Sequence, residues 1–327
     1  MAPNYTPAVT LDSPFVLVDL DRAPRSGLGL GTAGVSGRVF VGVAEKPVEA
    51  DGDPDFDILL TADPDPPRPW VSCADPYATA RRLAEIVSER PAASVALTQV
   101  LRMGPALAPA DRLVAESLAY STLQGSAGFR AWLDSAPART PRPSPAPVRL
   151  SRDGDRLAIT LDRPRARNAM DAGTRDALCE ALEVVVLDPS ITRVDLYGSG
   201  PAFCAGGDLS EFGTARDPAQ AHLVRVQRSP AALLQRCGER VIAHLHGACV
   251  GAGIELTAFA GRVVASPDTV IRLPEVGMGL IPGAGGTASL PLRVGRERTA
   301  YLALSGVGLS VGEALRWGLV DEVVEGE

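Results

Sequence analysis

Two glycine-rich turns in the C-terminal half of the sequence constrain its fold more than any other feature. The first turn, 247–253, follows the apolar run 241–243, and the second spans 281–287. Glu255 directly follows the first turn, and Glu275 precedes the second. Residues with little side chain let another molecule approach the main chain, and turns that open helices leave N–H groups free. The pattern predicts a site where backbone amides and two carboxylates meet.

A third turn of small residues adds to this arrangement. It spans 201–209 and follows the apolar run 194–197, as the first turn follows its own apolar run. Free N–H groups of two such turns can stabilise negative charge on one oxygen. The sequence therefore predicts a pair of amide donors for an oxyanion.

With these motifs the sequence resembles the crotonase superfamily, and within it the enoyl-CoA hydratases. Each motif is weak alone, but their order and spacing are specific, and the resemblance covers roughly 157–324. It implies an α/β fold with the crotonase-type ββα spiral. The matching segments are 203–209, 246–256, 274–279, 281–287, 304–306 and 317–320.

The resemblance also implies roles for individual residues. The oxyanion donors are the backbone N–H groups of Gly207 and Ala252, and alanine keeps the N–H where many relatives have glycine. Glu255 positions and deprotonates the water that attacks Cβ, and Glu275 exchanges a proton at Cα. The implied activity is syn addition of water to a trans-2-enoyl-CoA, giving a 3-hydroxyacyl-CoA. No metal or redox cofactor is expected, because coenzyme A enters as part of the thioester substrate.

Coenzyme A contacts are implied along 163–170 and 205–209. Lys46 is the only lysine, so arginine must meet any ligand phosphate. Arg165 and Arg167 are candidates because arginine forms bidentate bonds to phosphate; solvated surface arginines are the alternative. The residues assigned to this contact are Arg165, Arg167, Ala169, Ala205, Asp208 and Leu209.

Two other functions remain open. A double-bond isomerase of the same fold needs only the base at Glu275, so the presence of Glu255 favours water addition. A non-catalytic acyl-CoA-binding or scaffold protein has no reason to keep both carboxylates, although each alone could simply cap a helix. Cys204 has no base placed to activate it and is interpreted as a small buried filler. The histidines at 244 and 246 are interpreted as hydrogen-bonded strand residues, not as metal ligands.

The first 134 residues form a separate predicted unit. Short apolar runs at 15–20, 39–43 and 58–60 predict strands. Helical patterns follow from Asp75, a predicted N-cap, and then over 93–102, from 110 through 123, and over 127–133. Proline recurs across 135–148, which predicts an extended linker. The predicted units are thus 1–134, the linker 135–148, and a catalytic core over 149–327.

The upstream unit resembles the helical module that crotonases usually carry at their C-terminal end. Crotonases usually carry further helices after the segment 317–320, and this sequence ends soon after it. The helices over 80–133 resemble that C-terminal module, and 15–22 echoes 157–163. Our hypothesis is that 1–134 is a degenerate crotonase copy that supplies the module. An unrelated α/β domain is the alternative.

In the second unit, strands are expected at 157–161 and 194–197. One helix is expected over 174–186, with Asp171 or Thr174 as its cap, and another over 218–236. A short helix is expected over 311–317. Tyr120, Trp132 and Met278 are candidates for lining an acyl pocket.

Composition excludes some classes of partner. A net charge of −7 gives no reason to expect nucleic acid. Five cysteines, an odd number without a dense framework, favour reduced thiols and a cytoplasmic location. A leader peptide is not expected, because the N-terminus, which starts with residues 1–4, lacks a basic region and an apolar region. A membrane span is not expected, because no stretch reaches about 18 uninterrupted apolar residues. The resemblance implies a homotrimer or a dimer of trimers.

Overall fold

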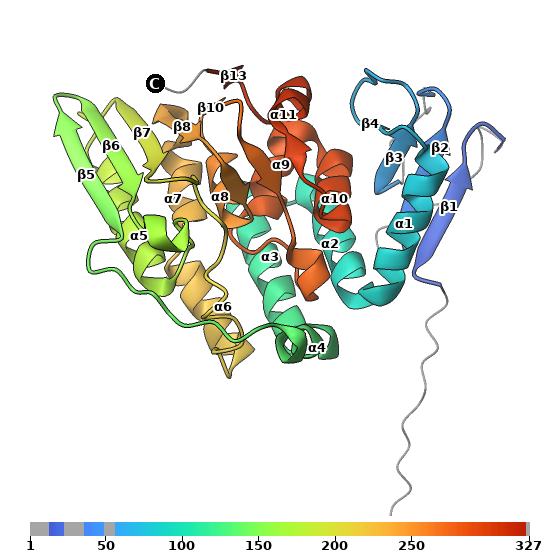
Figure 1. Cartoon of the computed structure of the whole chain (residues 1–327), viewed down its shortest axis with the longest axis horizontal. Coiled ribbons are helices and arrows are strands. Elements are labelled where there is room, and N and C mark those ends of the chain that lie inside the picture. Colours follow the sequence, from blue (N-terminus) through green and yellow to red (C-terminus); the bar gives the residue numbers. More distant parts are fainter. Residues whose placement is uncertain (1–12, 23–35, 49–55, 325–327) are drawn as a thin grey trace, which may run out of the picture.

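The structure is a computed structural model, and it describes residues 13–22, 36–48 and 56–324. The N-terminal residues on which the expectation of no leader rests lie outside these ranges. The described residues form three sheets, and most of the helices lie between the main sheet on one side and the sheet of the upstream unit on the other (Figure 1). The upstream unit lies beside α10 (Arg296–Ser305) and α11 (Val311–Trp317). The chain is thus an α/β protein, as predicted.

The largest sheet carries the two functional turns at one edge. Its strand order is β13-β10-β8-β7-β6-β5, and all neighbours are parallel except β5 and β6. Parallel neighbours end at the same edge, so the turns that follow β7 and β8 emerge together. The strands are β5 (Val148–Asp153), β6 (Arg156–Leu161), β7 (Arg193–Gly198), β8 (Val241–Leu245), β10 (Arg262–Ala265) and β13 (Glu322–Val323).

A small second sheet lays the turns side by side. It contains β9 (Ala248–Val250), β11 (Val270–Arg272) and β12 (Leu309–Ser310). Cys204 bridges to Cys249 of β9: its N–H donates to Ala248 O at 3.1 Å, and its carbonyl accepts from Val250 N at 2.9 Å. These bonds hold the turn after β7 against the turn after β8.

Helices follow the strands, and most predicted boundaries are close. Asp171 caps α5, since its carboxylate accepts from Thr174 N at 2.7 Å; of the two candidate caps, Asp171 is therefore correct. The helices of this half are α5 (Ala172–Leu187), α6 (Pro218–Gln227), α7 (Pro230–Cys237), α8 (Ala252–Thr257), α9 (Gly286–Val294), α10 (Arg296–Ser305) and α11 (Val311–Trp317), with short 3-10 helices η3 (Pro164–Ala166), η4 (Gly238–Arg240) and η5 (Glu275–Met278).

The prediction of a single helix over 218–236 is wrong. The chain leaves helical geometry at Arg228 and Ser229 and starts again at Pro230. A proline disfavours helical geometry in the residue before it and lacks an N–H for the preceding turn. The Ser229 hydroxyl then caps the new helix by accepting from Ala232 N at 3.1 Å.

The upstream unit is a parallel sheet followed by four helices. Its strands pair in chain order, β1-β2-β3-β4. Asp75 caps the first helix, as predicted, by accepting from Ala78 N at 2.8 Å. The elements are β1 (Phe15–Asp19), β2 (Val39–Ala44), β3 (Ile58–Thr61), β4 (Val71–Ser72), α1 (Pro76–Glu89), α2 (Pro91–Met103), the 3-10 helix η2 (Gly104–Ala106), α3 (Pro109–Gln124) and α4 (Ala127–Ser135).

The upstream helices pack directly on the second half of the chain. Helix α2 contacts α9 and α10, α3 contacts α6, α7 and α9, and α4 contacts η5. One continuous cluster of buried apolar side chains extends from Val39 in β2 to Val320 near the last strand. The upstream helices therefore pack on elements that follow the functional turns in the chain.

Candidate active site

A cavity of about 870 Å³ lies between the two halves of the chain. Its walls come from α3, from the turns after β7 and β8, from α6, and from the segment before α9. All four residues predicted to act in catalysis line this cavity: Gly207, Ala252, Glu255 and Glu275. Residues from three turns and two carboxylates are thus brought to one place.

The two amide groups are free to bind a ligand. Within the described residues, neither Gly207 N–H nor Ala252 N–H donates to a protein acceptor. Ala252 is the first residue of α8, where an N–H has no partner inside the helix. Gly206 and Gly251 precede the two donors with φ of +92° and +49°, which other residues rarely adopt. These glycines allow the turns that place Gly207 and Ala252 on the cavity wall.

Gly251 marks the point where the turns and acids converge. A Cβ placed on this residue would lie 2.5 Å from Glu275 Oε1, 3.6 Å from Gly206 Cα and 3.7 Å from Glu255 Oε1. No side chain fits there. Both carboxylates therefore approach the same small space beside both turns.

Glu255 is held by the start of helix α9. Its side chain is 2% exposed, and its Oε2 accepts from Ala284 N at 2.7 Å and from Gly286 N at 3.0 Å. Burial, together with the nearby Glu275, raises the pKa of Glu255. The two amides oppose this by stabilising its charged form.

Glu275 has a different environment. It opens η5, and within the described residues its enclosed Oε2 has no hydrogen-bond partner. Burial, and to a smaller extent the charge of Glu116, raise the pKa of Glu275 to about 8. Two acids this close do not ionise together readily, and amides favour charge on Glu255. Both acids therefore keep a proton to higher pH than an exposed glutamate does, and their proton binding is coupled.

The raised pKa of Glu275 predicts a pH dependence of stability. The folded state holds this proton more tightly than the unfolded chain, whose ordinary value is 4.5. The resulting stabilisation is complete below the unfolded pKa and is lost as pH rises through about 8. We expect the urea concentration at the midpoint of unfolding to decrease as the pH is raised from about 5.5 to about 8.5. The decrease should be smaller in Glu275→Gln. An equal fall in both proteins would contradict this prediction.

Of the residues predicted to contact coenzyme A, one lines the cavity and the others do not. Asp208 lines the cavity, and its carboxylate is already engaged: it accepts from Arg163 Nη2 at 2.9 Å and from Ser210 Oγ at 2.7 Å. Arg165 and Arg167 are exposed on the surface beside the linker, where Arg142 donates to Arg165 O at 3.1 Å. Ala169, Ala205 and Leu209 are partly buried and, like the two arginines, do not line the cavity. Their contact with coenzyme A stays a prediction.

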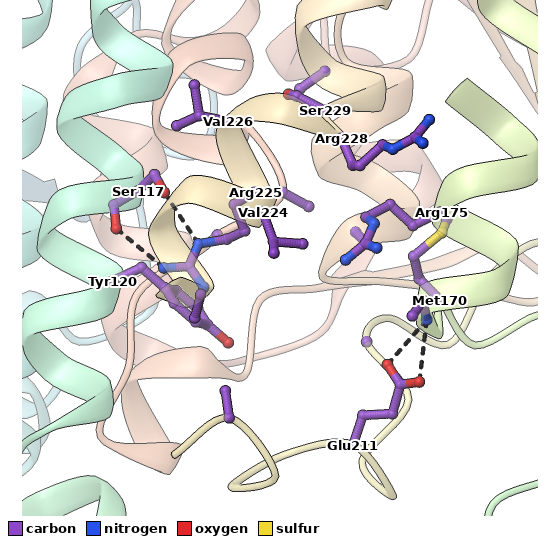
Figure 2. A pocket seen from close by; sticks show the side chains of 18 of the residues that line it. Ser117, Tyr120, Met170, Arg175, Glu211, Val224, Arg225, Val226, Arg228 and Ser229 are labelled. Atoms are coloured by element: carbon purple, nitrogen blue, oxygen red, sulfur yellow. Dashed lines mark hydrogen bonds between the residues drawn. The ribbon is translucent and has the colours of Figure 1, made fainter. Parts of the chain in front are cut away.

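Several residues of the cavity were not predicted from the sequence. Of the acyl-pocket candidates, Tyr120 lines the cavity, whereas Trp132 and Met278 do not. Trp132 instead stacks on Phe129, with ring centroids 5.9 Å apart. Arg225 from α6 lies over the Tyr120 ring at 4.7 Å and donates to Ser117 of α3 (Figure 2).

Glu116 is the most consequential of the missed residues. It belongs to α3, is 2% exposed, and lines the cavity with the two predicted acids. One signal was available: Leu113, Glu116, Tyr120 and Leu123 recur at intervals of three and four, which places a carboxylate on the buried face of the predicted helix.

A comparison with protein families identifies the chain. The model of the family described as enoyl-CoA hydratase/isomerase matches residues 156–327. The chain belongs to the enoyl-CoA hydratase/isomerase family. The matched segment contains both glycine turns, both predicted catalytic glutamates and both amide donors.

Relatives of this hydratase/isomerase chain match about half of its length. The 2,3-dehydroadipyl-CoA hydratase of Escherichia coli is 36% identical over 174 residues, which are 53% of this chain and 68% of the relative. The mevalonyl-coenzyme A hydratase of Aspergillus fumigatus is 35% identical over 172 residues, 52% of this chain and 63% of the relative. The chain thus spans less than two thirds of the length of some curated relatives.

A solved structure agrees with the α/β crotonase-type fold. The enoyl-CoA hydratase from Thermoplasma volcanium has a TM-score of 0.50 and 36% identity, over 55% of this chain and 72% of that structure. The family match leaves residues 1–155 of this hydratase/isomerase chain uncovered. Among its described helices, none combines the length and the apolar run that crossing a bilayer requires.

Proposed function

We propose that the protein is an enoyl-CoA hydratase that adds water syn to a trans-2-enoyl-CoA. The observation that carries this proposal is the convergence of two free amides and two glutamates on one cavity. A scaffold protein would have no need of such a cavity with two acids. An isomerase would need only one acid, whereas here both reach the same space.

The proposed reaction assigns one step to each of these groups. The thioester oxygen binds to Gly207 N–H and Ala252 N–H, which stabilise the negative charge that develops on it. Ionised Glu255 takes a proton from water as the water oxygen bonds to Cβ, and Glu275 gives its proton to Cα. The Cα–Cβ double bond becomes single, and proton exchange through solvent then restores both acids. The amides at the start of α9 favour the charged form of Glu255 that this sequence of steps requires.

The wild-type protein provides the first test. With crotonyl-CoA and longer enoyl-CoAs, we expect the absorbance of the conjugated thioester to decrease as 3-hydroxyacyl-CoA forms. A chain that binds these thioesters but leaves the absorbance unchanged across the whole panel would overturn the hydratase proposal and favour a binding protein. The same panel identifies the acyl group that the cavity accepts.

For the upstream unit, we propose that residues 1–134 are a degenerate copy of the same fold. Two observations support this proposal. Strands β1 to β4 pair in parallel and in chain order, as β6, β7, β8 and β10 do in the main sheet. Helices α2 to α4 pack against α9, α10 and η5, and residues of α3 and η5 line the cavity. In this proposal helices α2 to α4 serve as the helical module that crotonases usually carry after the segment equivalent to 317–320. The predicted unit boundaries, at residue 134 and residue 149, are part of the same proposal.

A further inference from the structure

Two carboxylates from opposite halves of the chain share the start of helix α9. Glu255 Oε2 accepts from the amides of Ala284 and Gly286. Glu116 accepts from the amides between and after them: Oε1 from Gly285 N at 2.6 Å, and Oε2 from Thr287 N at 2.7 Å. Four successive amides thus alternate between the two acids. Each acid is needed to fix the turn that orients the other.

Helix α3 is itself fixed at this position. Tyr120, one turn after Glu116, packs so closely on Gly283 that a Cβ there would lie 2.4 Å from the ring. Arg225 of α6 donates to Ser117 Oγ at 3.1 Å and to Gln124 Oε1 at 3.1 Å, on either side of Tyr120. The Glu116 carboxylate is therefore placed by a rigid element and not by a mobile side chain.

The charge of Glu116 also affects the ionisation of the two other acids. The ionisable groups that face it are Glu255 from α8, Glu275 from η5, Arg225 from α6 and Tyr120 from its own helix, with His222 of α6 bonded to the adjacent Ser117. Its negative charge opposes ionisation of both other acids. Burial raises its own pKa to about 7, although three donors stabilise its charged form. The charge of Glu116 therefore influences which protons the other two carboxyls hold.

We propose that Glu116 is a positioning residue of the active site, supplied by the upstream unit: it holds the first turn of α9, and thereby Glu255, and it tunes proton binding by Glu255 and Glu275. This inference rests on the proposed hydratase function for its kinetic consequence. Its structural consequence, the effect on the two other acids, can be measured without any turnover.

The experiment compares Glu116→Gln, Glu116→Asp and the control Glu85→Gln, an exposed position on α1, in the full chain. Side-chain carboxyl ¹³C shifts, assigned with Glu255→Gln and Glu275→Gln, report the two pKa values. We expect Glu116→Gln to lower both pKa values and to reduce kcat about 10- to 100-fold with KM changed less than about 3-fold. Glu116→Asp keeps the charge but not the reach, so we expect a similar loss of kcat with little change in the pKa values. The control should match wild type.

The outcomes separate this inference from the hydratase proposal. If no acyl-CoA is hydrated by wild type but the pKa values fall in Glu116→Gln, the function is wrong and the positioning role stands. If wild type is active and Glu116→Gln changes neither kcat nor the pKa values, the positioning role is wrong. Should Glu116→Gln not melt cooperatively, Glu116→Asp decides, and an unchanged kcat in that variant would overturn the proposal.

Discussion

Glu255→Gln is expected to lower the kcat of hydration by about 100-fold or more, while proton exchange at Cα continues. The amide oxygen of glutamine can still accept from Ala284 N and Gly286 N, so the start of α9 keeps its cap. The glutamine has no basic atom left to take a proton from water. Hydration is measured with crotonyl-CoA, and exchange at Cα by incorporation of solvent deuterium into recovered thioester.

This variant also distinguishes hydratase from isomerase. If the natural reaction is isomerisation of a 3-enoyl-CoA, Glu255→Gln should retain most of that activity, because Glu275 alone transfers the proton. The matched control is Glu180→Gln, the same change at an exposed position on α5. Hydration at the wild-type rate in Glu255→Gln, with a normal melting curve, would contradict the role assigned to this residue.

Glu275→Gln is expected to remove hydration, isomerisation and deuterium exchange together, each by about 100-fold or more. Every one of these reactions moves a proton at Cα, and within the described residues Glu275 is the acid with an enclosed oxygen that no donor occupies. The glutamine is nearly the same size, so the cavity wall should remain intact. Binding of a saturated acyl-CoA should therefore be close to wild type, and calorimetry measures it.

The two substitutions together test whether Glu255 and Glu275 have separate roles in the reaction. A protein in which Glu275→Gln loses hydration but keeps deuterium exchange at Cα would have its proton donor elsewhere. Equal loss of all three reactions in Glu255→Gln and Glu275→Gln would show that the acids act as one unit. Either result would contradict the separate roles that we propose.

Local signals in the sequence were sufficient for much of the fold. A side-chain oxygen before an apolar helical pattern predicted the caps at Asp75 and Asp171, because capping depends on residues only three positions apart. Short apolar runs identified strands, among them β8, which begins with the run 241–243. The break at Pro230 was also a local signal, and the prediction of one continuous helix overlooked it.

The site could be predicted only where its residues lie in recognisable motifs. Gly207, Ala252, Glu255 and Glu275 stand in or beside the glycine turns, and the structure brings them to one cavity. Glu116 stands far from them in the chain, within a helix that gave no sign of its partners. Its bonds to Gly285 and Thr287 exist only because α3 packs against α9.

The order and spacing of the motifs determined, from the sequence alone, the family, the α/β fold and the pair of acids, because turns and caps depend on near neighbours. Only the tertiary structure decided which half of the chain completes the cavity and which acid each amide of α9 binds. Such contacts join residues distant in sequence, and their strength comes from burial and from shared donors. Neither property is encoded in a local pattern.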